Sequence, residues 1–231
     1  MLVGYDTGRY GGILANPGFL RQFGSYHPAK KTDALDSLHT SLLSSLAFIG
    51  KLFGCFMSGP AIERFGHRIV FYGLSVISVI GIIIEATAAN SGIGTGRYAQ
   101  FVIGRIVVYA SVGLVEVTVT TYQHEIVPAA FRGLVVIFLQ LFLDVGSFIA
   151  TGVNKAFSTY TSGVGWKAAT GIQFIFPMLI VCFTFFIPNW PRWLLSMDRA
   201  EEAIVALRRL RSKQEVENGL SEAEIQAFAR L

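Results

Sequence analysis

Long apolar stretches separated by short polar segments dominate the first 187 residues of the chain. An α-helix needs roughly 20 apolar residues to cross a hydrocarbon core of about 30 Å. Stretches of that length are Leu38–Gly59, Ile69–Ala88, Tyr98–Thr118, Gly133–Gly152 and Ala168–Ile187, and a shorter one is Met1–Ala15. The pattern predicts an all-α membrane protein with a six-helix transmembrane bundle over residues 1–187, in which the first helix is shorter than a full span.

After Pro188 the pattern changes to apolar positions at helical spacing among charged residues. Asp198 is followed three residues later by Glu201, and Ser221 by Glu224, and both pairs have the spacing of a capping box at the start of a helix. Residues 188–231 are therefore predicted to form short amphipathic helices in the cytosol. They either dock beneath the bundle or lie on the membrane surface.

The composition agrees with a membrane protein. Hydrophobic residues make up 52% of the chain and charged residues 15%, against roughly 25% charged residues in soluble domains. The net charge of +4 comes from short loops and the tail rather than from one basic patch with interleaved aromatics, so we expect no nucleic-acid partner. Lys and Arg are more numerous on the side that holds loop 60–68 and the tail, which predicts that this side is cytosolic.

The sequence contains no pattern typical of an enzyme. It has no nucleophile, base and orienter set, no metal-ligand spacing and no Walker sequence, so we expect no catalytic activity, no metal and no cofactor. Ser91–Arg97 is glycine-rich but lies between two spans, which indicates a turn rather than a phosphate-binding loop. Cys55 and Cys182 are expected to pack as apolar side chains.

The predicted loop between the second and third spans carries a recognisable motif. Residues 59–68 read Gly-Pro-Ala-Ile-Glu-Arg-Phe-Gly-His-Arg. This resembles the major facilitator superfamily pattern Gly-x-x-x-Asp-Arg-x-Gly-Arg-Arg, which lies between helices two and three of that fold. Glu63 keeps the charge of the usual aspartate. His67 replaces a permanent cation with a group that titrates near neutrality.

Further motifs resemble the sugar porter family of that superfamily. They are Gly104-Arg105 in the fourth span, Tyr-Gln-His-Glu-Ile-Val-Pro-Ala-Ala-Phe-Arg-Gly at 122–133, and Trp-Pro-Arg-Trp at 190–193. The resemblance runs from about Tyr5 to Leu210 and covers the N-terminal half of a twelve-helix fold. It implies a missing C-terminal half or a second chain as a partner, and a first helix that begins late.

The resemblance assigns proton coupling to Asp6 and Arg105. A carboxylate in a span needs a partner or a water path, so Asp6 either couples protons or lies near hydrated chain ends. Arg9 stands where the family generally has an apolar residue. It is less than one turn from Asp6, and it either competes with Arg105 or holds Asp6 ionised.

The family places a sugar-binding glutamine in the fifth span, at Gln140. Asp144 is four residues further on the same helical face, and is either a second substrate contact or a partner of Lys155 or Arg9. Two other acids fall in predicted spans. Glu85 is interpreted as reaching the headgroups, whereas Glu116 stays open between a functional and a structural role.

Charged residues at the predicted cytosolic ends of the helices are expected to form an inner gate whose salt bridges break as the two halves rock. They are Glu63, Arg64, Arg68, Glu125, Arg132 and Arg192.

The resemblance implies transmembrane sugar transport by alternating access, with a sugar and a proton as substrates in the lipid bilayer of a plasma membrane. Facilitated diffusion is the alternative to symport. A sugar-sensing receptor on the same scaffold and a non-transporting half-length protein are the alternatives to transport.

Overall fold

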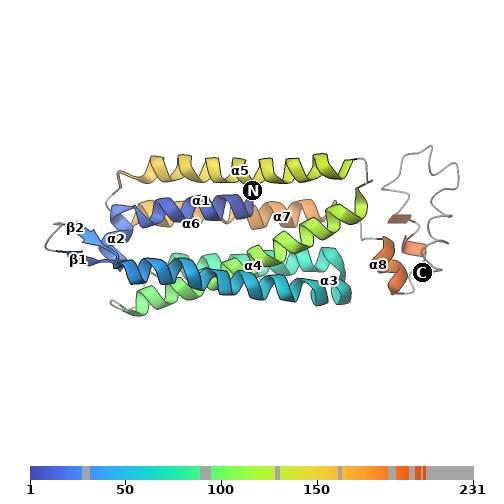
Figure 1. Cartoon of the computed structure of the whole chain (residues 1–231), viewed down its shortest axis with the longest axis horizontal. Coiled ribbons are helices and arrows are strands. Elements are labelled where there is room, and N and C mark those ends of the chain that lie inside the picture. The colour runs from blue at the N-terminus through green and yellow to red at the C-terminus, as the bar shows by residue number, and fades with distance from the viewer. Residues whose placement is uncertain are drawn as a thin grey trace.

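A computed structural model shows the chain as long helices that run side by side, with short elements at the two ends of the bundle (Figure 1). It describes residues 1–27, 32–88, 95–127, 131–160, 163–186, 191–197, 201–203 and 205–206. The helices of the bundle are α1 (Leu2–Leu14), α3 (Ser37–Thr87), α4 (Thr95–Ile126), α5 (Arg132–Phe157), α6 (Val164–Ile172) and α7 (Ile175–Thr184). In length and apolar character α3, α4, α5 and the combined α6–α7 segment suffice to cross a membrane.

Helix α3 supplies two legs of the bundle, because it turns back at Gly66. This glycine has φ 75° and ψ 162°, a backbone conformation that residues with a Cβ rarely adopt. Gly50 in the first leg lies against Ile106 of α4, and Glu85 in the second leg lies against Gly104. Both legs therefore run along the same part of α4. The turn predicted over 60–68 was too wide, since the helix continues through Pro60 almost to Gly66.

Glycines let the first leg of α3 and α4 approach closely. A Cβ on Gly54 would meet the carbonyl of Ala110, and a Cβ on Gly113 would meet that of Lys51. Small residues at such contacts allow backbone-to-backbone packing, which is how membrane helices associate without a hydrophobic driving force.

The last span is broken into α6 and α7 at residues 173–174. Pro177 explains the break, because a proline inside a helix lacks the N–H that would bond to the carbonyl four residues earlier, here Gln173. The predicted span Ala168–Ile187 corresponds to one membrane-spanning segment, Val164–Thr184, but its interruption was not predicted. The interruption places the Gln173 side chain, which is fully buried, inside the bundle.

Elements at one end of the bundle were not predicted. Asn16 caps α2 (Pro17–Phe23) by accepting a hydrogen bond from the Gly18 N–H at 2.9 Å, with Pro17 in the first turn. A two-stranded antiparallel ladder follows, formed by β1 (Ser25–His27) and β2 (Thr32–Ala34). At this end Phe19, Phe101 and Trp166 pack edge to face or tilted against one another.

The short helix α8 (Pro191–Ser196) lies at the opposite end (Figure 1). The Trp193 ring covers Gly66, and its Nε1 donates a hydrogen bond to the Glu63 carbonyl at 2.9 Å. The amphipathic helices predicted further along the tail lie largely outside the described residues.

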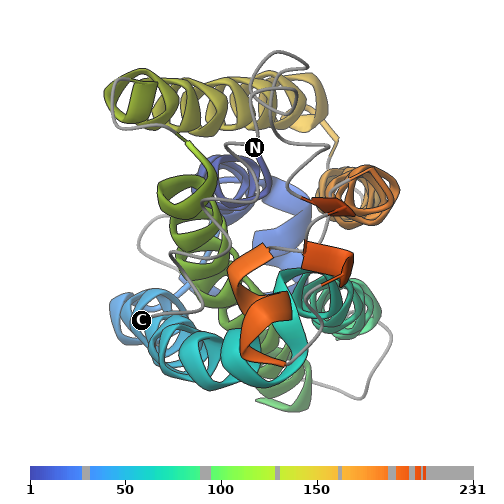
Figure 2. The same ribbon diagram turned by 90° about the vertical axis from the view of Figure 1, so that its right-hand side faces the viewer.

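Helix α1 occupies the middle of the bundle, below α5 and between α4 and the α6–α7 segment (Figure 2). Gly4 and Gly8 let it approach α5, because their faces lie against the backbone of Leu143 and Ser147. Most of α5 faces outward, and its exposed side chains include Phe138, Phe142 and Phe148. Asp6 and Arg9 of α1 are thus held inside the molecule, whereas Thr7 is exposed.

Candidate functional site

Two charged side chains of α1 point into the bundle. Asp6 and Arg9 are three residues apart and therefore share one face of the helix. Asp6 is 1% exposed and Arg9 is fully buried. A charge in such a position persists only when it is paired, because isolating it from water costs several kcal/mol or more.

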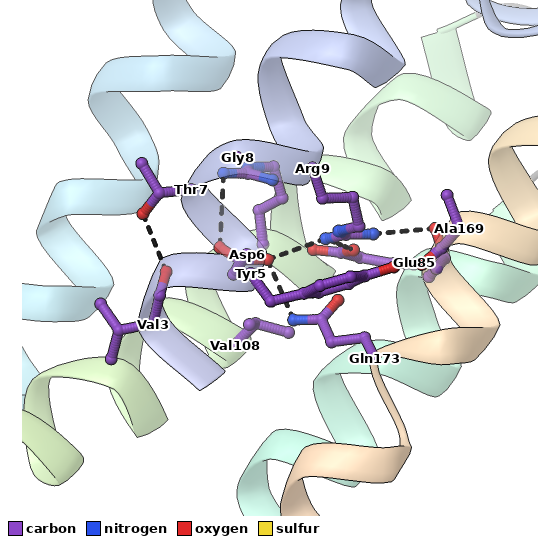
Figure 3. Close-up of polar contacts among 12 residues, drawn as sticks. Val3, Tyr5, Asp6, Thr7, Gly8, Arg9, Glu85, Val108, Ala169 and Gln173 are labelled. Carbon is purple, nitrogen blue, oxygen red and sulfur yellow. Dashed lines mark hydrogen bonds and ion pairs between the residues drawn. The ribbon is translucent and has the colours of Figure 1, made fainter. Parts of the chain in front are cut away.

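Arg9 bridges two carboxylates from different helices (Figure 3). Its Nη2 lies 2.9 Å from Asp6 Oδ1 and 2.8 Å from Glu85 Oε2. Its Nη1 donates to the Thr170 hydroxyl of α6 at 2.8 Å. Arg9 therefore links α1 to both α3 and α6.

Asp6 contacts further groups from α4 and from the break between α6 and α7. Gln173 Nε2 donates to Asp6 Oδ1 at 2.9 Å. Arg105 Nη2 lies 3.9 Å from Asp6 Oδ2, an ion pair longer than a hydrogen bond. The two residues named for proton coupling are therefore neighbours, but the nearest cation to Asp6 is Arg9.

Arg105 is held mainly by aromatic rings. Its guanidinium carbon lies 3.8 Å from the centroid of the Tyr10 ring and 4.8 Å from that of Tyr109. Such stacking stabilises a cation by about 0.5–2 kcal/mol. Among the described residues, Arg105 Nε and Nη1 have no hydrogen-bond partner. Arg105 thus keeps unused donors beside the two acids.

The interpretation of Glu85 as a headgroup contact was wrong. Glu85 is fully buried, pairs with Arg9, and packs against Gly104 of α4. The absence of a side chain at Gly104 leaves the room that Glu85 fills. The available sequence signal was an unmatched acid in one apolar span and an unmatched base, Arg9, in another.

The cluster formed by Asp6, Arg9, Glu85 and Arg105 contains two acids and two bases, so its formal charge is zero. Neutral balance makes the burial of four ionisable groups tolerable, while removal of one partner of a buried pair costs about 3–5 kcal/mol. Thr170 and Gln173 add hydrogen bonds to Arg9 and Asp6, and neither was predicted from the sequence. We call the four charged residues, together with Thr170 and Gln173, the buried cluster.

Gln140 and Asp144 lie away from the buried cluster, on the exposed face of α5. Gln140 Nε2 donates to Asp144 Oδ1 at 3.1 Å. Among the described residues, Asp144 forms no ion pair with Arg9 or Lys155, so that alternative was wrong. The pair presents an amide and a carboxylate at the surface of the bundle.

Glu116 forms an ion pair between helices. Lys51 Nζ of α3 lies 2.9 Å from Glu116 Oε1 of α4, and their side chains are 31% and 36% exposed. Glu116 also borders a groove of about 360 Å³ whose lining is mostly apolar, including Phe71, Phe142 and Phe176. Such a lining does not suit a hydroxyl-rich ligand.

Four of the six residues named for the inner gate lie where α3 turns and where α5 begins. Glu63, Arg64 and Arg132 are exposed, and Arg68 is partly buried. Within the described part of the chain, no ion pair joins these four to one another. The side chains of Glu125 and Arg192 lie outside the described residues.

His67, in the turn between the two legs of α3, is 2% exposed, and its ring packs at a tilt against the Tyr122 ring, with the centroids 5.3 Å apart. Burial lowers the pKa of His67 to about 4, because the charged imidazolium is poorly solvated there. His67 is therefore neutral at pH 7. It packs in the turn rather than serving as the cation of the usual motif.

Comparisons with known proteins give the same family as the motifs. A family model described as "Sugar (and other) transporter" matches residues 1–227. The high-affinity glucose transporter ght2 of Schizosaccharomyces pombe is 31% identical over 207 residues, which cover 89% of this chain and 38% of that protein. The low-affinity glucose transporter HXT4 of Saccharomyces cerevisiae is 30% identical over 202 residues, covering 87% and 34%.

Solved structures show the same fold. The proton:xylose symporter XylE, bound to 6-bromo-6-deoxy-D-glucose, superimposes with a TM-score of 0.83 at 24% identity, covering 99% of this chain and 50% of that one. The inward-open conformation of XylE from E. coli gives a TM-score of 0.74 at 23% identity, covering 99% and 54%. The chain thus spans about half of that structure and just over a third of the two curated relatives.

Proposed function

The chain belongs to the sugar transporter family of the major facilitator superfamily, and on that premise we propose that its bundle is one half of a proton-coupled sugar transporter. The observation that carries the proposal is the burial of Asp6 beside Arg105 and Arg9 in a membrane helix bundle. Ionisable residues in such positions mark ion or proton pathways.

Proton coupling follows from the way the two cations hold Asp6. Arg105 is on α4 and Asp6 on α1, so a shift between these helices changes their 3.9 Å separation. A carboxylate that loses a cation in a dry environment takes up a proton, and it releases the proton when the cation returns. Alternation between these two situations couples proton movement to the conformational cycle.

We place the sugar between this bundle and a second six-helix half. Alternating access works by rocking two repeats about a site at their interface near the bilayer midplane. Gln140 and Asp144 are exposed on α5, and an amide and a carboxylate together offer donors and acceptors to hydroxyl groups. The groove beside Glu116 is too apolar for that role.

The inner gate belongs to the same proposal. Glu63, Arg64, Arg68 and Arg132 gather at the end of the bundle where α3 turns, together with the segments that carry Glu125 and Arg192. Charges that are exposed and unpaired with one another are available to a second half. The distribution of Lys and Arg supports a cytosolic location for this end and for the tail. We propose the plasma membrane as the location of the whole protein.

Uptake of labelled glucose in a yeast host without its own hexose transporters tests the proposal. The chain is expressed alone and joined to the remaining part of the fission-yeast glucose transporter. We expect saturable uptake only for the joined protein, with accumulation that requires an acidic exterior. Strong accumulation by the chain alone would show that it functions without a second half of different sequence.

The variant Asp6→Asn separates transport from coupling. It should abolish accumulation while sugar exchange between equal pools survives, because the amide imitates the protonated acid. Glu116→Gln is the matched control, since it neutralises an acid outside the buried cluster. Unchanged, pH-sensitive accumulation by Asp6→Asn contradicts coupling at Asp6, and sugar that merely equilibrates in the wild type contradicts coupling altogether.

A further inference from the structure

Arg9 forms one ion pair within its own helix and one with another helix. Arg9 and Asp6 are both on α1, three residues apart, so their 2.9 Å contact moves with α1 as a unit. Arg9 and Glu85 are on α1 and α3, so their 2.8 Å contact changes when α1 shifts against α3. Movement of α1 therefore removes Arg9 from Glu85 but not from Asp6.

The two acids also differ in how many groups hold them. Asp6 Oδ1 accepts hydrogen bonds from Arg9 and Gln173, and its Oδ2 faces Arg105. Glu85 Oε2 accepts a hydrogen bond from Arg9, and its Oε1 has no partner among the described residues. Loss of Arg9 leaves Glu85 without a hydrogen-bond donor from the described part of the chain.

The charges around Glu85 come from α1 and α4. They are the cations Arg9 and Arg105 and the anion Asp6. The other residues of α3 within one turn, Gly81–Ala88, are uncharged. The α6–α7 segment contributes only the uncharged Thr170 and Gln173 to this cluster. Without Arg9, Glu85 has no bonded cation, and the one remaining cation, Arg105, is shared with the like charge of Asp6, which favours the neutral acid of Glu85.

We propose that Glu85 is a second proton-binding carboxylate of the buried cluster, which exchanges the guanidinium of Arg9 for a proton when α1 moves relative to α3. The exchange is balanced: one proton from the aqueous phase binds a Glu85 oxygen, Arg9 stays with Asp6, and no covalent bond breaks. The formal charge of the cluster rises from zero to +1. The inference deepens the proposed function, on which its role in transport rests.

The proton on Glu85 is measured directly by infrared difference spectroscopy of the purified chain in phosphatidylcholine vesicles. A change of pH between neutral and acidic buffer gives a carbonyl-stretch signal when a carboxylate becomes an acid. We expect one component of this signal, due to Glu85, that disappears in Glu85→Gln and persists in Asp6→Asn. Glu116→Gln is the matched control, and should leave it unchanged.

Removal of the cation gives a second, independent readout. In Arg9→Met the neutral acid of Glu85 should be more populated at a given pH, so the signal of the acid should grow. In the double variant Arg9→Met/Glu85→Gln that growth should be absent. The double variant carries no unpaired charge at either position. It can therefore replace Glu85→Gln in the test if that single variant does not fold.

A signal that is lost in Asp6→Asn and kept in Glu85→Gln overturns the proposal, as does no carboxylic acid signal in the wild type or in Arg9→Met. Because the measurement involves no sugar flux, its outcome is separate from that of the uptake experiment. A Glu85 signal in a protein that only equilibrates sugar would leave the proton site intact and refute symport.

Discussion

Charged residues occur in two regions of this bundle, and the two regions differ in how far the charges are buried and paired. In the buried cluster, Asp6, Arg9 and Glu85 are at most 1% exposed and are joined by contacts of 2.8–2.9 Å (Figure 3). At the turn of α3 and the start of α5, Glu63, Arg64 and Arg132 are exposed and form no ion pair with one another.

The difference lies in what each arrangement permits. Buried charges must be paired in every state that the bundle adopts, so any change of partner needs another ion or a proton. Exposed charges are solvated, so they can gain or lose a partner at a cost near zero. The buried cluster is therefore suited to binding protons, and the exposed group is suited to contacts that depend on conformation.

The largest expected effect is that of removing the shared cation. Arg9→Met leaves Asp6 and Glu85 buried with only Arg105 between them, and should lower the free energy of unfolding by about 3–5 kcal/mol at neutral pH. The double variant Arg9→Met/Glu85→Gln removes one charge of each sign and should recover about half of that loss or more. Unfolding in mixed micelles measures both. Equal losses in the two variants would contradict a direct Arg9–Glu85 coupling.

The next effect concerns the turn of α3 and depends on pH. The pKa of His67 is about 4 in the folded protein, below its value of 6.5 when exposed, so the unfolded chain binds the extra proton. Stability is therefore complete above pH 6.5 and falls as the pH decreases toward 4. Between pH 7 and 5 the loss due to His67 should be about 1–2 kcal/mol.

His67→Gln provides the comparison for that prediction, because its amide does not titrate. The difference in unfolding free energy between the wild type and this variant should change with pH in the sense described. A difference that stays constant from pH 7 to 5 would show that His67 is not desolvated, and the turn would then resemble the exposed region.

Sequence patterns predicted much of the fold, since apolar length alone located the long helices. The break at residues 173–174 was missed because Pro177 acts through a single hydrogen bond that hydropathy does not report. The family motifs predicted that Asp6 and Arg105 lie next to each other. The pairing of Glu85 with Arg9 was not predicted, because the two residues are 76 positions apart in the sequence. Their contact depends on how α3 folds back at Gly66.

A smaller effect is expected for the Lys51–Glu116 ion pair, which is less buried than the buried cluster and less exposed than the charges at the turn of α3. Lys51 and Glu116 are 2.9 Å apart but about one third exposed, so their charges are less isolated within the protein than those of the buried cluster. Lys51→Met/Glu116→Gln should change the unfolding free energy by no more than about 1 kcal/mol. The same micelle assay measures it. A loss as large as that of Arg9→Met would mean that burial is not what distinguishes the buried cluster.

The smallest effect on stability should come from Arg132, with a change in conformation instead. Arg132 is exposed, and among the described residues its Nε donates to the Val127 carbonyl at 3.4 Å, so Arg132→Ala should alter the unfolding free energy by less than about 0.5 kcal/mol. In the transporter joined to its second half, the same variant should expose the central site to the cytosolic side, because a contact that closes the inner face is lost.

Labelling of a cysteine introduced at Gln140 by a membrane-impermeant reagent, applied to inside-out vesicles, measures that exposure. Lys155→Ala, at the other end of α5, is the matched control and should leave labelling unchanged. Labelling that does not differ between Arg132→Ala and the wild type would remove Arg132 from the inner gate while leaving the buried cluster as it stands.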